Sequence, residues 1–189
     1  LADGRLCPVE GLGRGREDRQ GLRAGDQEGG ELAQRLGFAD SLLARPLGDL
    51  RLVASDLGLV AVEWADNQLE LDSYLARLKR VVLPNQKKTA PYAREIREYL
   101  NGKRAAFTIP IDWTPFTQFQ REALQAVFRI PYGETRTYMD IAREIDRPHA
   151  YRAVGAANAM NPIPLVIPCH RVIGMDGKLH GYGGGEGLP

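Results

Sequence analysis

The sequence contains very few cysteines and histidines. Of its 189 residues, only Cys7 and Cys169 are cysteine, and three are histidine. Cys7 lies in a Gly- and Arg-rich stretch without apolar periodicity, so we expect no structural disulfide. The histidines, His149, His170 and His180, stand at none of the spacings typical of zinc ligands, so no metal site is expected. Cys169 is therefore interpreted as a free thiol.

Long apolar runs and a charge of one sign are also missing. No stretch approaches the roughly 20 consecutive apolar residues of a membrane span, and the N-terminus lacks the basic-then-apolar order of a secretory signal. We therefore expect a cytoplasmic, nucleoid-associated or nuclear protein with no membrane partner. The formal net charge is only +1, so no overall field indicates a nucleic-acid partner. Any contact with DNA must depend on local geometry.

Residues 1–40 contain little that could form an apolar core. They are rich in Gly and charged side chains, so burial cannot repay the entropy lost on ordering. We expect a flexible extension over 1–40, an N-terminal α+β domain over 41–110 and a C-terminal domain over 111–189.

Apolar patterning in residues 41–110 indicates strands followed by helices. The runs LRLVAS and LVAVEW are separated by residues 56–58, whose Gly58 suits a tight turn, and they predict a β-hairpin. A helix should follow from residues at helical spacing, and a second one over APYAREIREYLNG, with Asn101 and Gly102 as its stop. The residues at helical spacing are Leu71, Leu75, Leu78 and Val82.

The segment after Thr114 predicts a mostly helical domain. Apolar residues within 116–128 share one helical face, and the sequence PYG at 131–133 ends that helix. Thr137 followed by Asp140 resembles a capping box, so the next helix is expected to begin at Thr137. The shared face consists of Phe116, Phe119, Ala123, Leu124, Val127 and Phe128.

A further helix is expected to start at Pro148, whose missing N–H suits the first helical position. Arg152 points away from its apolar side and lies beside small residues, so another molecule could approach closely. A helix-turn-helix on DNA is the functional interpretation. On this pattern alone, two amphipathic helices with a solvated Arg152 are the commoner alternative. The apolar side holds Ala150, Ala153, Val154 and Ala157, and the small neighbours are Gly155, Ala156 and Ala159.

The run NPIPLVIPCHRVIG carries the second cysteine next to a histidine. Its prolines exclude a helix, so a buried strand over 165–167 is expected to deliver Cys169 into a turn. Cysteine attacks as the thiolate, of which a thiol with a pKa near 8.5 supplies only a few per cent at pH 7. His170 is the nearest group that could accept the proton, directly or through one water. By itself this pair is weak evidence, because buried cysteines are usually inert.

The surrounding sequence resembles the O6-alkylguanine-DNA alkyltransferases, whose active-site signature has PCHRV at its centre. The likeness extends back through FQREAL, IPYGETRTYMDIA and RAVGAANAMNP and forward through GYGGG, over nearly all of 114–189. From about Leu43 the layout is similar to the family's variable N-terminal domain. The resemblance implies an α+β fold: a small N-terminal α/β domain with a hairpin or sheet, and a mostly helical C-terminal domain. That second domain would carry a helix-turn-helix and the active-site cysteine.

The resemblance also implies a role for each matching residue. Cys169 would be the alkyl acceptor, His170 its water-linked base, and Asn161 the brace between recognition helix and active-site strand. Arg152 would enter the duplex in place of the target nucleotide. Tyr138 would press on the adjacent phosphate, and it could donate a hydrogen bond to the departing guanine.

Further residues are assigned to the DNA surface and the substrate pocket. The helix-turn-helix would bring Thr137, Ala153 and Gly155 to the DNA. The pocket would be lined by Pro168, Tyr182, Gly183 and Gly184, whose glycines let backbone approach the alkyl group.

The implied reaction is DNA repair by a methylated-DNA–protein-cysteine S-methyltransferase. An alkyl group on O6 inside a stacked duplex is out of reach of a buried thiolate, so the base must flip out. The partner would be double-stranded DNA containing O6-alkylguanine, and by extension O4-alkylthymine. A thioether has no good leaving group, so each molecule should act once. We also expect a monomer that needs no metal or organic cofactor.

The sequence departs from the family at its end. In the family, a glutamate beyond the GYGGG loop hydrogen-bonds the active-site histidine. This chain stops at Pro189, before that helix, and Glu186 lies too close to the loop to replace it. We expect His170 to be less well oriented, transfer to be slower and the second domain to be less stable.

Three other functions fit parts of the pattern. An alkyltransferase-like protein would bind lesions with impaired transfer because the glutamate helix is absent, but a cysteine at 169 argues against this. A DNA-binding regulator would use the helix-turn-helix alone and leave PCHRV unexplained. A Cys-His hydrolase would turn over an ester or amide repeatedly.

Overall fold

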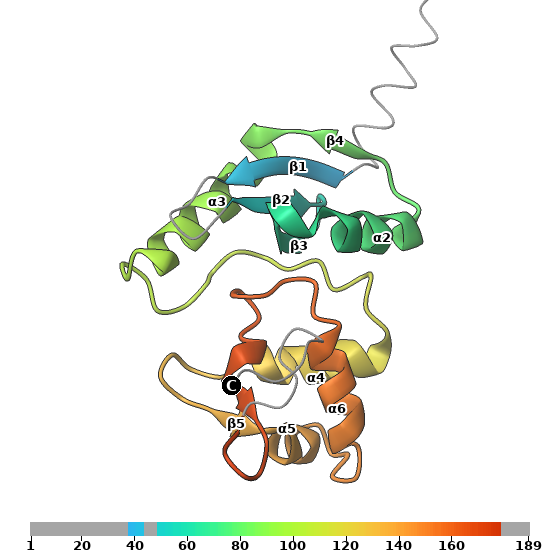
Figure 1. The fold of residues 1–189 in the computed structure, drawn as a ribbon, viewed down its shortest axis with the longest axis vertical. Coiled ribbons are helices and arrows are strands. Elements are labelled where there is room, and N and C mark those ends of the chain that lie inside the picture. Colours follow the sequence, from blue (N-terminus) through green and yellow to red (C-terminus); the bar gives the residue numbers. More distant parts are fainter. Residues whose placement is uncertain (1–37, 44–48, 179–189) are drawn as a thin grey trace, which may run out of the picture.

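The computed structural model describes residues 38–43 and 49–178, which form two halves stacked along the long axis (Figure 1). The N-terminal half, up to residue 113, holds a four-stranded sheet and two long helices. The C-terminal half, from residue 114, holds three helices and a two-stranded ladder. This mixed architecture confirms the predicted α+β fold. Residues 1–37, for which a flexible extension was expected, lie outside the described residues.

The four-stranded sheet has the order β3-β2-β1-β4. Strands β1, β2 and β3 pair antiparallel in succession, and β4 pairs parallel with β1. The helices α2 and α3 flank this sheet, and α2 packs against β3 while α3 packs against β1 and β2. The elements are β1 Phe38–Leu43, β2 Leu50–Ala54, β3 Leu59–Trp64, the 3₁₀ turn η1 Ala65–Asn67, α2 Gln68–Leu78, β4 Val82–Pro84 and α3 Gln86–Leu100.

The predicted hairpin is confirmed as β2 and β3. Gly58 has φ +151°, and a Cβ on it would lie 2.6 Å from the carbonyl oxygen of Pro110. Glycine is therefore needed because the segment between the two halves passes directly over this turn. That segment is hydrogen-bonded to the hairpin on both sides of Ile111, through Leu59 N to Pro110 O at 2.9 Å and Asp112 N to Leu59 O at 3.0 Å.

In the N-terminal half, strands β1 and β4 and the end of α2 differ from the expectation. Strand β1 begins at Phe38, inside the stretch expected to be an extension, and it was not predicted because its sequence FADSLL lacks the alternating apolar pattern of a strand. Val82, placed on a helix by its spacing, lies in β4, because α2 ends at Leu78 and Lys79 takes a left-handed conformation at φ +50°. Helix α3 stops at Asn101 as predicted.

The C-terminal half is built around three short helices, α4 Gln118–Phe128, α5 Tyr138–Glu144 and α6 Tyr151–Ala159. The capping box of Thr137 and Asp140 is confirmed at the start of α5. Pro148 was expected to begin α6, which is wrong. Asp146 adopts φ +57° and prolongs the turn, so α6 begins only at Tyr151. The remaining elements are β5 Arg136–Thr137, the 3₁₀ turn η2 Cys169–Arg171 and β6 Val172–Ile173.

One apolar cluster runs through both halves. Leu52, Leu59 and Ile96 of the N-terminal half belong to the same buried cluster as Leu124 and Ile167 of the C-terminal half. In addition, Val62 N of β3 donates to Pro162 O at 2.9 Å. The halves therefore share a core, and burial of this common surface holds them together. Within the described ranges, no helix has the length and apolarity to cross a membrane.

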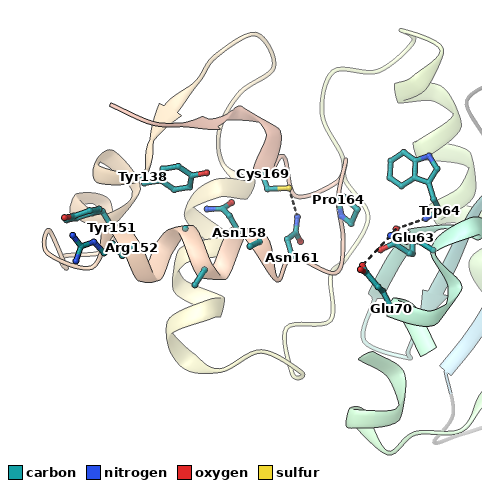
Figure 2. A pocket seen from close by; sticks show the side chains of 14 residues that line it. Glu63, Trp64, Glu70, Tyr138, Tyr151, Arg152, Asn158, Asn161, Pro164 and Cys169 are labelled. Atoms are coloured by element: carbon teal, nitrogen blue, oxygen red, sulfur yellow. Dashed lines mark hydrogen bonds between the residues drawn. The ribbon is translucent and has the colours of Figure 1, made fainter. Parts of the chain in front are cut away.

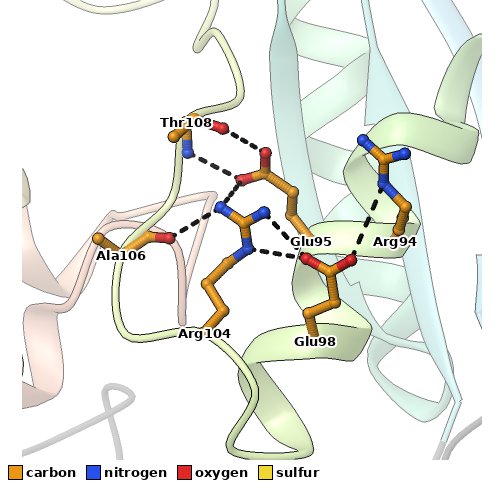
Figure 3. Close-up of polar contacts among 6 residues, drawn as sticks. All are labelled: Arg94, Glu95, Glu98, Arg104, Ala106 and Thr108. Atoms are coloured by element: carbon orange, nitrogen blue, oxygen red, sulfur yellow. Dashed lines mark hydrogen bonds and ion pairs between the residues drawn. The ribbon is translucent and has the colours of Figure 1, made fainter.

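A buried carboxylate fixes the connecting segment on α3 (Figure 3). Glu95 is 5% exposed and accepts hydrogen bonds from the backbone N–H of Thr108, at 2.8 Å, and from its hydroxyl. Arg104 lies 3.2 Å from the Glu95 carboxylate and binds Glu98 at 2.9 Å. Burial by itself would raise the pKa of Glu95, but the Thr108 hydrogen bonds, the Arg104 charge and the amide of Ile109 together hold it below its usual value.

We predict that Glu95→Gln destabilises the protein at pH 7 by about 1–3 kcal/mol, because it removes an anion that accepts charge-assisted hydrogen bonds. The folded-state pKa lies below the usual 4.5. The carboxylate's contribution is therefore complete above that value and is lost as pH falls through the folded pKa. Urea unfolding across acidic pH should show a flatter dependence in Glu95→Gln. Glu98→Gln, at a partly exposed side chain, should cost less than about 1 kcal/mol. Equal costs for both variants would contradict this assignment.

Candidate active site

The segment between α6 and η2 forms a compact turn. Ile167 N donates to Ile163 O at 2.9 Å, Val166 N donates to Pro164 O at 2.9 Å, and Leu165 adopts φ +68°. The strand expected over 165–167 is therefore wrong. Pro162 and Pro164 lack the N–H groups that a ladder requires, and the apolar side chains are buried by coiling the chain instead.

Asn161 holds this turn together through its side chain. Its Oδ1 accepts from Ile163 N at 3.0 Å, and its Nδ2 donates to Ile167 O at 3.0 Å. The same Nδ2 lies 3.2 Å from the Sγ of Cys169 as a hydrogen-bond donor. One carboxamide thus spans the turn and reaches the sulfur.

Cys169 is a free, half-buried thiol at the start of η2. It lines a cavity of about 650 Å³ that continues along α6 to Tyr151 and Arg152. Figure 2 shows the sulfur between Tyr138 and Asn161, with the first half of the chain across from it. The thiol is therefore neither capped by a described partner nor sealed from a cleft, and a molecule in the cavity can reach it.

The residues predicted to contact DNA from α6 differ in their exposure. Arg152 is exposed and its guanidinium lies 5.6 Å from the ring centre of Tyr151, while Gly155 is half-buried. Val154 and Ala157 are buried as predicted. Ala153 was placed on the apolar side but is exposed, like Tyr151 and Arg152 in the same first turn of α6. Thr137 is half-buried with its hydroxyl 2.7 Å from Asp140, as the cap of α5.

Tyr138 lies at the start of α5 and faces the same cavity. Its ring packs over Gly155, where an added Cβ would lie 3.8 Å from Cε1. Burial, and after it the negative charge of Cys169 when ionised, raise the pKa of Tyr138 above its usual value. The phenol therefore stays protonated at pH 7 and can donate a hydrogen bond.

His170 is half-buried next to Cys169, and no hydrogen bond joins the two side chains in the described part of the chain. Burial lowers the pKa of His170, and the charge of Arg171 lowers it further. The imidazole is therefore neutral at pH 7 and can accept a proton.

The predicted pocket residues are only partly covered by the structure. Tyr182, Gly183 and Gly184 lie outside the described residues. Pro168 is buried and lines an adjacent cavity of about 280 Å³. Among residues 38–43 and 49–178, no group of three or more His, Cys, Asp or Glu is arranged to hold a metal ion.

Comparison with known proteins gives matches along most of the chain. Residues 40–113 match the family model described as "6-O-methylguanine DNA methyltransferase, ribonuclease-like domain", and residues 118–188 match its "DNA binding domain". A methylated-DNA–protein-cysteine methyltransferase from Methanosarcina barkeri is 40% identical over 149 residues, covering 76% of this chain and 87% of that protein. The chain belongs to the methylated-DNA–protein-cysteine methyltransferase family.

Other members of this methyltransferase family agree. An inducible methylated-DNA–protein-cysteine methyltransferase from Bacillus subtilis is 50% identical over 105 residues, which are 56% of this chain and span only 58% of that protein. The crystal structure of Mycobacterium tuberculosis OGT in complex with DNA is 34% identical, covers 79% of this chain and 86% of that chain, and has a TM-score of 0.63. The resemblance inferred from PCHRV is therefore confirmed.

Several cavity residues of this methyltransferase-family chain were missed by the sequence analysis. Glu63, Trp64, Asn67 and Glu70, from β3, η1 and α2, form the wall opposite Cys169. No local pattern could identify them, because their role depends on how the two halves pack. Asn158 was also missed. It is 8% exposed, its Nδ2 donates to Val154 O at 3.1 Å, and its Oδ1 has no partner among the described residues.

We predict that Asn161→Ala lowers the free energy of unfolding by about 1–3 kcal/mol, because Ile163 N and Ile167 O lose their shared partner inside the turn. Hydrogen exchange should be faster at the Ile163 amide than in the unmodified protein. Asn67→Ala, at an exposed position on the same cavity, should change stability by less than about 0.5 kcal/mol. An unchanged Ile163 exchange rate in Asn161→Ala would show that the carboxamide does not hold the turn.

Proposed function

We propose that this chain repairs DNA by transferring an alkyl group from O6 of guanine in a duplex to the Sγ of Cys169, once per molecule. The observation that carries the proposal is a free thiol at the end of a cavity that opens along the exposed face of α6. Family membership supports the same chemistry, since the named relatives are methylated-DNA–protein-cysteine methyltransferases.

The transfer is a displacement at the alkyl carbon. A bond forms between Sγ and that carbon, the bond from the carbon to O6 breaks, and the electron pair leaves with the guanine. We assign His170 the role of the base that takes the thiol proton through a water, because its lowered pKa leaves the imidazole neutral at pH 7. Tyr138 is the donor that stabilises the departing base, because its raised pKa keeps the phenol protonated.

Asn161 supports the attacking atom. Its N–H group at 3.2 Å from Sγ stabilises negative charge on the sulfur before attack. It also fixes the direction of the thiol, which matters because misplacement by about 1 Å can cost roughly 100-fold in rate. No cofactor enters these steps.

The target nucleotide must leave the duplex to reach Cys169. Arg152 stands exposed at the mouth of the cavity and can fill the vacated space in the base stack. Thr137, Ala153 and Gly155 complete the surface that contacts the DNA. Tyr182, Gly183 and Gly184, which lie outside the described residues, are assigned to the alkyl-binding pocket by the GYGGG motif, whereas Pro168 lines the adjacent cavity. Residues 111–189 act as the catalytic domain of a monomer. The same displacement extends to O4-alkylthymine.

Lesion binding without transfer is the second candidate. It would use the same cavity and α6 surface but leave the thiol unmodified. The half-buried, unblocked sulfur of Cys169 favours transfer over this alternative.

Intact-mass analysis after incubation with O6-methylguanine duplex DNA should show a gain of one methyl group. The gain should disappear in Cys169→Ala and persist in Cys7→Ala, which removes the other cysteine of the sequence. Stable binding without any change in mass would select lesion binding instead.

Arg152→Ala should slow repair of duplex DNA by about 10-fold or more, because nothing offsets the few kcal/mol of unstacking. Reaction with free O6-benzylguanine should change by less than about twofold, since no duplex is opened. Arg97→Ala, at an exposed arginine on α3, serves as the matched control and should leave both rates unchanged. Equal losses on both substrates in Arg152→Ala would remove Arg152 from the extrusion step.

A further inference from the structure

Arg171, in the turn that carries Cys169, is a buried cation. Arg171 is the third residue of η2, two positions after Cys169, and it is 9% exposed. Its Nη1 donates to the carbonyl oxygen of Ile130 at 2.8 Å, and its Nη2 donates to the hydroxyl of Tyr99 at 3.1 Å. Its guanidinium also lies 5.4 Å from the ring centre of Tyr132. No carboxylate in the described ranges pairs with it.

These contacts join three parts of the chain that are far apart in sequence. Tyr99 lies in the last turn of α3, in the N-terminal half, 72 positions from Arg171. Ile130 lies just after α4, on the segment that leads into α5, 41 positions away. The ring of Tyr99 is itself held against Phe107, with centroids 4.8 Å apart. The guanidinium is therefore hydrogen-bonded to both halves of the chain.

The turn that carries the nucleophile has few restraints of its own. Within η2, Arg171 N donates to Pro168 O at 2.9 Å and Val172 N donates to Cys169 O. Such short 3₁₀ segments have poor hydrogen-bond geometry and depend on their surroundings. Asn161 holds the turn from the cavity side, at Sγ. Arg171 is the anchor on the opposite side.

We propose that Arg171 is a positioning residue for alkyl transfer, which fixes the Cys169–His170 turn to helix α3 through Tyr99. In this arrangement the N-terminal half sets the direction of both the nucleophile and the base, although it contributes neither. The inference rests on the proposed transfer to Cys169. Removing a hydrogen bond from a buried charged donor costs more free energy than removing one from a neutral donor. The rate of displacement in turn depends on how well the attacking atom is oriented.

The mildest test removes a single hydroxyl. With O6-benzylguanine as substrate, Tyr99→Phe should lower the maximal rate constant for benzyl uptake about 10-fold or more, the scale expected for one charge-assisted hydrogen bond. The half-saturating substrate concentration should stay unchanged, because the cavity wall is left intact. Tyr74→Phe is the matched control on α2. Its hydroxyl is buried without a partner among the described residues, so its loss should leave the rate unchanged.

A second variant separates the hydrogen bond from the charge. Arg171→Lys keeps the cation but cannot reach two acceptors with a planar fork. It should transfer more slowly than the unmodified protein and faster than Arg171→Met. The double variant Tyr99→Phe/Arg171→Lys should be no slower than Arg171→Lys alone, because the two residues share one interaction.

Three results would overturn the proposal: a Tyr99→Phe rate equal to that of the unmodified protein, an equal loss in Tyr74→Phe, or fully additive losses in the double variant. Thermal unfolding of Tyr99→Phe and Tyr74→Phe checks that both remain folded. If the unmodified protein takes up no benzyl group at all, the transfer to Cys169 fails and this inference fails with it. Uptake by the unmodified protein that is insensitive to Tyr99 overturns the anchor alone.

Discussion

The site depends on one carboxamide. Asn161 follows the end of α6, and its side chain satisfies a buried N–H and a buried carbonyl inside a turn that two prolines keep from forming regular structure. The Nδ2 group of the same side chain also donates a hydrogen bond to the Sγ of Cys169. Because this one group joins the end of α6 to Cys169, a shift of α6 would reach the thiol through a hydrogen-bonded path.

The first half of the chain is a structural partner of the second. Val62 of β3 donates to Pro162 in the active-site turn, and the segment around Pro110 lies on the hairpin. The cavity wall opposite Cys169 comes from β3, η1 and α2. The family models divide the chain into residues 40–113 and 118–188, yet the cavity that Cys169 lines is formed by residues of both parts.

Local sequence patterns predicted what depends on local chemistry. The capping box at Thr137, the hairpin around Gly58 and the end of α3 at Asn101 were read correctly, because each is set by a few adjacent residues. Strand β1 was missed because FADSLL lacks the alternating apolar pattern of a strand. Val82 was misplaced because its long-range pairing with Phe38 overrides the local helical spacing. The motif around Cys169 predicted the family correctly, but the strand expected over 165–167 is a turn.

The shared apolar cluster limits how this chain can be divided. Leu59 and Ile96 on one side and Leu124 and Ile167 on the other are buried against a common interior. A fragment cut between the two halves would expose part of this interior to water on both pieces, at roughly 25 cal/mol for each Å² of apolar surface. The smallest unit that folds on its own therefore includes both halves. The C-terminal half cut out alone would expose an apolar surface and tend to aggregate.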